Sequence, residues 1–163
     1  MSTDSCSSED QLEIRVPCKP EYVRTVRRAV SDFAQSVKMP QAAIEAIEIA
    51  ASEAVANIVR HAYDGTQKAL PVRVRCSHRR NGLMLEVVDR GRGFAAPPPG
   101  TMPEIDLDRE GGLGIILMKS LMDRVNYVSK PDAGTRIKMT KRARETVARL
   151  SRSMAHADRV PGP

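Results

Sequence analysis

The sequence contains no tryptophan, and it has only three tyrosines and two phenylalanines in 163 residues. Proteins that hold single-stranded nucleic acid commonly stack its bases on aromatic side chains, so this composition disfavours that class of function. No apolar run approaches the roughly 20 residues that a membrane-spanning helix needs. The polar segment Met1–Asp10 has no apolar stretch behind it that could form a signal peptide. The sequence therefore predicts a cytoplasmic protein with no membrane segment.

Cysteine is scarce and scattered. The three cysteines are Cys6, Cys18 and Cys76, an odd number with no metal-ligand spacing. They suggest no disulfide framework. We expect free thiols in a reducing compartment.

Acidic side chains are the minority, with 20 Asp and Glu against 26 Lys and Arg, and the net charge is +6. A basic chain raises the question of nucleic-acid binding. Much of the excess lies after residue 140, however, at Lys141, Arg142, Arg144, Arg149 and Arg152. This distribution favours a solvated tail or a patch for an acidic protein partner over direct nucleic-acid binding. A DNA-binding regulator that uses the tail remains the weaker alternative.

Apolar periodicity predicts the first half of the chain as a strand followed by two helices. Leu12, Ile14 and Val16 alternate with charged residues, as in a half-buried strand. Spacings of three and four then predict a helix from Pro20 to about Lys38. A second helix begins near Pro40 and ends at Asp64-Gly65.

The second half reads as strands around an irregular loop. Strands are expected at 70–76 and 83–88, joined by Asn81-Gly82 as a two-residue hairpin turn. The proline-rich stretch 94–110 has no regular pattern, and long loops of this kind are usually lids or binding loops. A short helix follows, with apolar positions Leu113, Ile116, Leu117, Leu121 and Met122. Two further strands are expected at 125–128 and 135–140, and residues 141–155 look helical and basic.

This order predicts an α+β fold, with one mixed, mostly antiparallel sheet covered by helices on one face. We expect a disordered leader at 1–10, one domain at 11–141, and a basic helical or flexible extension at 142–163.

Three short motifs carry candidate chemistry. Glu53, Asn57 and His61 share one side of the second helix, because they lie at i, i+4 and i+8. Their neighbours are small and apolar, so these polar groups are costly there unless they have partners or a function. An ordinary solvated helix edge is the alternative interpretation.

The other two motifs are glycine-rich. Asp89-Arg90-Gly91-Arg92-Gly93 follows a strand directly, and its glycines let the backbone approach a ligand. Gly111-Gly112-Leu113-Gly114 ends the irregular loop and begins a helix, whose exposed N–H groups would favour a phosphate. A tight turn and a simple hinge are the alternatives. The three motifs together, in this order, favour a nucleotide pocket over three unrelated local features.

With these motifs, the chain resembles the anti-sigma-factor serine/threonine kinases, within the histidine-kinase-like (GHKL) ATPase superfamily. Glu53 to Asn57 with His61-Ala62-Tyr63 is similar to the N box of that family. Asp89 to Phe94 is similar to the first glycine box, and Gly111 to Ile115 with Leu121-Met122-Asp123 to the second. The resemblance covers about Leu12 to Lys141 and implies the two-layer α/β sandwich of these ATPases.

The resemblance also implies roles for individual residues. Glu53 would be the general base, Asn57 would hold Mg²⁺, and Asp89 would read the adenine amino group of ATP. The residues implied to contact the nucleotide beside these are Arg60, His61, Gly91, Gly93, Arg109, Gly112, Leu113, Gly114 and Thr135. Phosphoryl transfer depends mainly on positioning and charge neutralisation, which such a set would supply.

We therefore expect an ATP-dependent protein serine/threonine kinase that is also an anti-sigma factor. It would phosphorylate an anti-anti-sigma antagonist of the STAS type and sequester an alternative sigma factor. The resemblance also implies a homodimer. The alternative is a partner-switching adaptor that binds nucleotide with little turnover and has a target other than a sigma factor.

Overall fold

The computed structural model describes residues 10–62, 70–91, 93, 112–130 and 133–143. The expected lid at 94–110 and most of the basic C-terminal extension lie outside these residues. The elements in chain order are β1 (Gln11–Val16), α1 (Tyr22–Ser36), α2 (Gln41–Ala62), β2 (Val72–Arg79), β3 (Gly82–Val88), α3 (Gly112–Leu121), β4 (Arg124–Lys130) and β5 (Gly134–Arg142). This is the order of strands and helices that the periodicity predicted.

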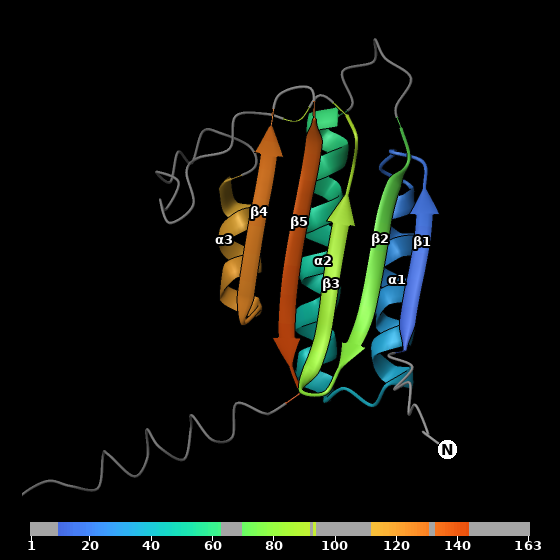
Figure 1. The fold of residues 1–163 in the computed structure, drawn as a ribbon, viewed down its shortest axis with the longest axis vertical. Coiled ribbons are helices and arrows are strands. Elements are labelled where there is room, and N and C mark those ends of the chain that lie inside the picture. The colour runs from blue at the N-terminus through green and yellow to red at the C-terminus, as the bar shows by residue number, and fades with distance from the viewer. Residues whose placement is uncertain (1–9, 63–69, 92, 94–111, 131–132, 144–163) are drawn as a thin grey trace, which may run out of the picture.

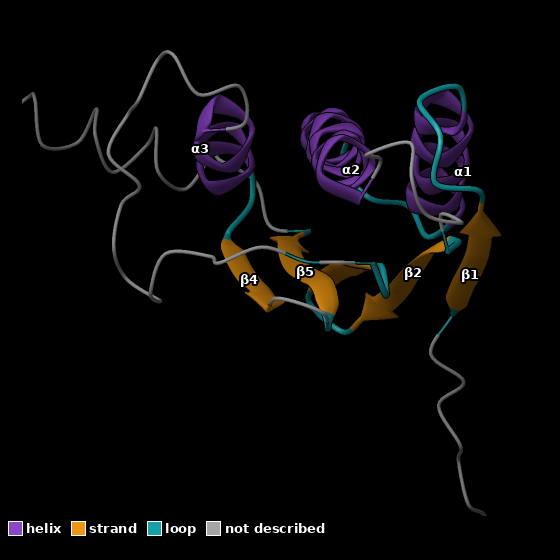
Figure 2. Cartoon of the chain, turned by 90° about the horizontal axis from the view of Figure 1, so that it is seen from above, coloured by secondary structure: helices purple, strands orange, loops and turns teal. Residues whose placement is uncertain are grey.

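The five strands form one sheet in the order β1-β2-β3-β5-β4. Where a mixed, mostly antiparallel sheet was expected, all four pairings between the described strands are antiparallel. Figure 2 shows α1, α2 and α3 on one face of this sheet. The predicted two-layer α+β architecture is therefore confirmed. Within the described residues, no helix is long and apolar enough to cross a bilayer.

The core lies between the two layers, because successive strand residues point to opposite faces. The helix-facing set includes Val74, Leu85 and Ile137, each with no exposed side-chain surface. From the helical layer, α2 contributes Ile47 and Val55, which are also fully buried. The apolar side of α2 is thus the surface that packs on the sheet.

The β2–β3 hairpin turns one residue earlier than expected. Its two-residue turn is Arg80-Asn81, and Gly82 is the first residue of β3, paired with Arg79. The prediction of Asn81-Gly82 as the turn was wrong in position. Gly82 has a φ of +152°, and a Cβ there would collide with the Lys141 carbonyl of β5. The glycine is required by the neighbouring strand, which local turn preference cannot reveal.

Two further predictions fail in the second half of the chain. The last strand runs through Arg142, so Lys141 and Arg142 belong to β5 and not to a C-terminal helix. In α3, Leu113 is 65% exposed and Leu117 is 38% exposed, although both were expected on the apolar face. The buried positions are Gly114 and Met118 in α3 and Met122 directly after it, four residues apart. This face is selected by close contact with α2.

The segments that carry the motifs lie together at one end of the sheet. The C-terminal end of α2, the end of β3, the end of β4 and the start of β5 all lie at the top of Figure 1. This arrangement brings residues separated by about half the chain to one end of the domain.

Candidate functional site

The first group of polar side chains at this end of the sheet is centred on α2. Glu53 and Asn57 lie one helical turn apart, and Asn57 is only 2% exposed. The Nη1 of Arg60 donates a hydrogen bond of 3.3 Å to the Asn57 Oδ1. We refer to Glu53, Asn57, Arg60 and Gly114 as the Asn57 cluster.

Gly114 belongs to this cluster because α3 approaches α2 at that residue. A Cβ built on Gly114 would lie 2.7 Å from the Glu53 Oε2 and 3.2 Å from the Asn57 Nδ2. Neither distance leaves room for a methyl group without movement of both side chains. Gly114 therefore packs directly against the polar face of α2. The glycine of the third motif and the two polar residues of the first form one structural unit.

The amide nitrogen of Asn57 is buried, and no described residue accepts a hydrogen bond from it. Such a group costs about 1–3 kcal/mol when it is left without a partner. An external polar group at this position can supply the acceptor that the described residues lack.

The second group lies where β3 ends and β5 begins. Asp89 is 5% exposed, and its two carboxylate oxygens accept different backbone N–H groups. Oδ1 accepts from Gly91 at 2.6 Å, and Oδ2 accepts from Thr135 at 3.1 Å. The Asp89 N–H in turn donates to the Thr135 carbonyl at 3.0 Å. We refer to Asp89, Gly91, Gly93, Gly134, Thr135 and Ser129 as the Asp89 cluster.

Two glycines allow the Asp89 cluster to close. Gly134 has a φ of +79°, and a Cβ there would lie 2.8 Å from the Arg90 Cα and against the Asp89 carbonyl. Gly93 has a φ of +57°, and a Cβ there would collide with the Lys130 carbonyl. Both residues adopt a conformation that side chains disfavour, at points where two backbones nearly touch. The Asp89 turn is thereby clamped against the β4–β5 turn.

The surroundings of Asp89 include groups that the sequence did not indicate. The Ser129 and Thr135 hydroxyls lie 2.8 Å apart in a hydrogen bond, which fixes the Thr135 side chain. Burial raises the pKa of the Cys18 thiol, and the charge of Asp89 raises it further. Burial and then Asp89 likewise raise the pKa of the Tyr127 hydroxyl. Cys18 and Tyr127 are therefore neutral neighbours of the carboxylate at physiological pH.

The predicted site residues are only partly within the described structure. The described residues bring Glu53, Asn57, Arg60 and Gly114 together, and they bring Asp89, Gly91, Gly93 and Thr135 together. Gly112 is the first residue of α3, beside the exposed Leu113. Arg109 and the side chain of His61 lie outside the described residues. Ser129 and Gly134 were not predicted as site residues, although a glycine directly before Thr135 was a usable signal.

The residues present fit a magnesium ion that arrives with a phosphate ligand. No group of three His, Cys, Asp or Glu side chains that could hold a metal occurs in the described part of the chain. Mg²⁺ retains several waters and commonly takes its remaining ligands from substrate phosphates and one or two side chains. Asn57 suits this role, because rotation of its amide would present Oδ1 in place of the unpartnered Nδ2.

Comparison with known proteins assigns the family. Residues 16–141 match the histidine kinase-like ATPase domain. The chain is 34% identical over 142 residues to the serine-protein kinase RsbW of Staphylococcus aureus, covering 83% of this chain and 88% of that protein. It is 36% identical over 142 residues to the RsbW of Bacillus velezensis, covering 83% and 87% of the two chains.

Solved structures agree on the fold. The RsbU and RsbW domains of a Mycobacterium tuberculosis protein match with a TM-score of 0.60 at 21% identity, over 82% of this chain and 32% of that chain. A blue-light activated histidine kinase of Erythrobacter litoralis matches with a TM-score of 0.53 at 21% identity, over 78% and 42% of the two chains. The domain match and the sequence relatives confirm the expected family: this chain belongs to the anti-sigma-factor serine/threonine kinases of the histidine kinase-like ATPases.

Proposed function

We propose that this protein transfers the γ-phosphate of ATP to a serine or threonine of a small anti-anti-sigma protein of the STAS type. We further propose that it sequesters an alternative sigma factor and that it works as a homodimer. The observation that carries the kinase proposal is the Asn57 cluster, where a carboxylate, an unpartnered amide and a glycine-lined helix start meet. The serine-protein kinase names of the relatives support the same activity.

The two clusters would bind opposite ends of the nucleotide. The carboxylate of Asp89 has a fixed orientation, because two backbone N–H groups hold its two oxygens. Each oxygen keeps a second lone pair, which can accept a hydrogen bond from an exocyclic amino group such as that of adenine. The Asp89 cluster therefore suits the base of the nucleotide, and the start of α3 suits its phosphates.

Glu53 is the group we assign to proton removal. Its carboxylate takes the proton of the substrate hydroxyl as that oxygen forms its bond to the γ-phosphorus. The bond from this phosphorus to the bridging oxygen breaks, and ADP leaves with the electron pair. Bound Mg²⁺ would neutralise charge on the phosphates. Asn57 would hold that ion through its Oδ1, and the Arg60 guanidinium beside it would add positive charge at the same end.

Replacement of Glu53 tests this assignment. The Glu53→Gln protein should transfer phosphate about 10²–10⁴-fold more slowly, the usual contribution of a general base. Its affinity for ATP should stay within about twofold, because the side-chain shape is kept. Transfer is measured with labelled ATP on proteins captured from native lysate, and ATP affinity by calorimetry.

Glu45→Gln is the matched control, since Glu45 is an exposed carboxylate on the same helix whose partner is Gln41. It should leave both quantities unchanged. Undiminished transfer by the Glu53→Gln protein would remove Glu53 as the base. If the unaltered protein binds ATP and exchanges partners with nucleotide but transfers no phosphate, the adaptor function replaces the kinase.

A further inference from the structure

The face of the sheet away from the helices is strongly cationic. The strand register places nine arginine and lysine side chains on it, together with only two carboxylates, Glu13 and Glu86. The nine are Arg15, Arg73, Arg75, Arg79, Arg124, Lys130, Arg136, Lys138 and Arg142. The excess of seven exceeds the net charge of +6 of the whole chain. Figure 2 shows no described helix on this side, and we call it the open face.

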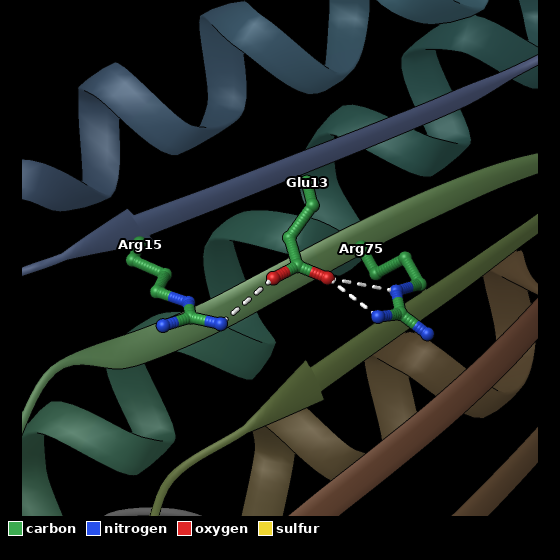
Figure 3. Close-up of polar contacts among 3 residues, drawn as sticks. All are labelled: Glu13, Arg15 and Arg75. Carbon is green, nitrogen blue, oxygen red and sulfur yellow. Dashed lines mark hydrogen bonds and ion pairs between the residues drawn. The ribbon is translucent and has the colours of Figure 1, made fainter.

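Internal ion pairs neutralise only part of this charge. Figure 3 shows Glu13 between Arg15 and Arg75, at 3.2 Å and 2.5 Å from the nearest guanidinium nitrogens. Glu86 lies 3.7 Å from Arg136. Among the described residues, no carboxylate pairs with Arg73 or Lys138. The open face therefore retains cations that an anionic partner can reach.

A depression of about 270 Å³ gives the open face a defined feature. The depression lies at the end of the sheet where β3 ends, and its lining combines arginines with apolar side chains. The lining residues are Arg15, Arg73, Arg90, Leu70, Pro71 and Val88. Leu70 is 50% exposed there. Three guanidinium groups around an apolar floor suit an apolar side chain that is flanked by carboxylates, because arginine pairs with carboxylates in a two-pronged geometry.

The chemistry of the face separates the candidate occupants. A second copy placed face to face would bring two cationic surfaces together, which is unfavourable. A nucleic acid would bring its phosphates toward Glu13 on the edge strand β1 and Glu86 on the central strand β3. It would also find no aromatic ring to stack on, since Tyr127, the tyrosine within the described strands, is on the helix-facing side. An acidic polypeptide fits the cations and the apolar floor together.

We propose that the open face docks an acidic segment of a partner protein, with an apolar residue of that segment seated in the depression. This surface is separate from the phosphate-transfer groups, and the proposal does not depend on the kinase activity. Strand alternation places Val88 and Arg90 on the open face, while Asp89 between them faces the helical side.

The test uses the full chain and short synthetic peptides. The probe is a fluorescein-labelled peptide of alternating Glu and Leu, compared with Glu-Gly and Gln-Leu versions and with a labelled DNA duplex. Binding is followed by fluorescence anisotropy. The Glu-Leu peptide should bind most tightly of the four. Equal binding of the Glu-Gly peptide would contradict the seating of an apolar side chain in the depression. Tighter binding of the duplex would contradict the assignment of a polypeptide as the partner.

Charge reversal locates the binding. Arg15→Glu with Arg73→Glu should weaken binding of the Glu-Leu peptide by about tenfold or more, because two attractions become repulsions. The control is Arg27→Glu with Arg28→Glu, which makes the same change of net charge at exposed positions of α1. It should change affinity by less than about threefold. Equal losses in both double variants, or no loss in the first, would overturn docking on the open face. Circular dichroism checks that both variants fold.

Discussion

The Asp89 cluster and the Asn57 cluster are built in opposite ways. In the Asp89 cluster, backbone N–H groups satisfy both carboxylate oxygens, and the turn is clamped by glycines at positive φ. In the Asn57 cluster, a buried amide nitrogen has no partner among the described residues. The first cluster is complete without a ligand, and we propose that a ligand completes the second. Changes in the first should therefore lower folding stability, while changes in the second should lower function at little cost in stability.

Gly134→Ala should give the largest loss of stability. The new methyl would lie 2.8 Å from the Arg90 Cα, in a residue whose φ is +79°. Strain and steric overlap together should lower the unfolding free energy by about 3 kcal/mol. Urea unfolding without nucleotide measures it. Ala133→Ser, at the exposed neighbouring position, is the control and should stay within about 0.5 kcal/mol. Similar small losses for both would contradict the clamp.

Asp89→Asn should come next, because it affects both stability and ligand binding. An amide has one acceptor oxygen, so its NH₂ would face the N–H of Gly91 or Thr135. The expected loss is about 1–3 kcal/mol of unfolding free energy, with weaker ATP binding in calorimetry. Asp123→Asn is the matched control, since the exposed Asp123 accepts one backbone N–H from Arg142. Unchanged ATP affinity would remove Asp89 from the adenine site.

Asn57→Leu should produce the opposite pattern. Leucine keeps the branched shape of asparagine and removes the unpartnered nitrogen, which offsets the loss of the hydrogen bond from Arg60, so stability should stay within about 1 kcal/mol. Phosphate transfer should fall to background, because the amide is no longer present to meet the metal and phosphates. Urea unfolding and the transfer assay are run on the same preparation. A loss of more than about 2 kcal/mol would show that Asn57 is structural, and the contrast between the clusters would fail.

The ion pair of Glu13 and Arg75 should show the smallest effect, because it lies outside both clusters and is exposed. The hydrogen bond from Arg75 lowers the pKa of Glu13 below its ordinary value of 4.5. The pair therefore contributes stability above that value and loses it as the pH falls through the lower folded-state pKa. Arg75→Gln should reduce the unfolding midpoint slightly at neutral pH and not at all in strong acid. An equal reduction at both would exclude the ion pair as its cause.

Much of the architecture followed from local pattern. The alternation of Leu12, Ile14 and Val16 and the long apolar stripe of α2 each gave the correct element, because both periods report burial on one face. The same rule failed for α3, where Leu113 and Leu117 are exposed and Gly114 is buried. A helix of ten residues offers few positions for the pattern. Its buried face was selected by the approach of α2, which hydrophobicity does not encode.

The residues of the candidate site could be named from the sequence, but the contacts between them could not. Glu53 and Asn57 could be grouped beforehand, because helical spacing alone puts them on one side. That Gly114 would touch both could not be predicted, since α3 follows a long segment of chain without regular pattern. The role of Ser129 was also hidden, because its hydroxyl partner Thr135 becomes its neighbour only through the pairing of β4 with β5.

The sequence by itself determined most of the elements, the family motifs and the residues proposed to carry the chemistry, because periodicity and spacing are local properties. The tertiary structure decided which of these residues meet and which hydrogen bonds remain unmade. It also decided where the positive charge lies. The sequence directed attention to the basic residues after 140, whereas strand pairing gathers nine cations on the open face. Alternation sends every second residue of a strand to that face, and the pairing of the five strands joins these residues into one surface.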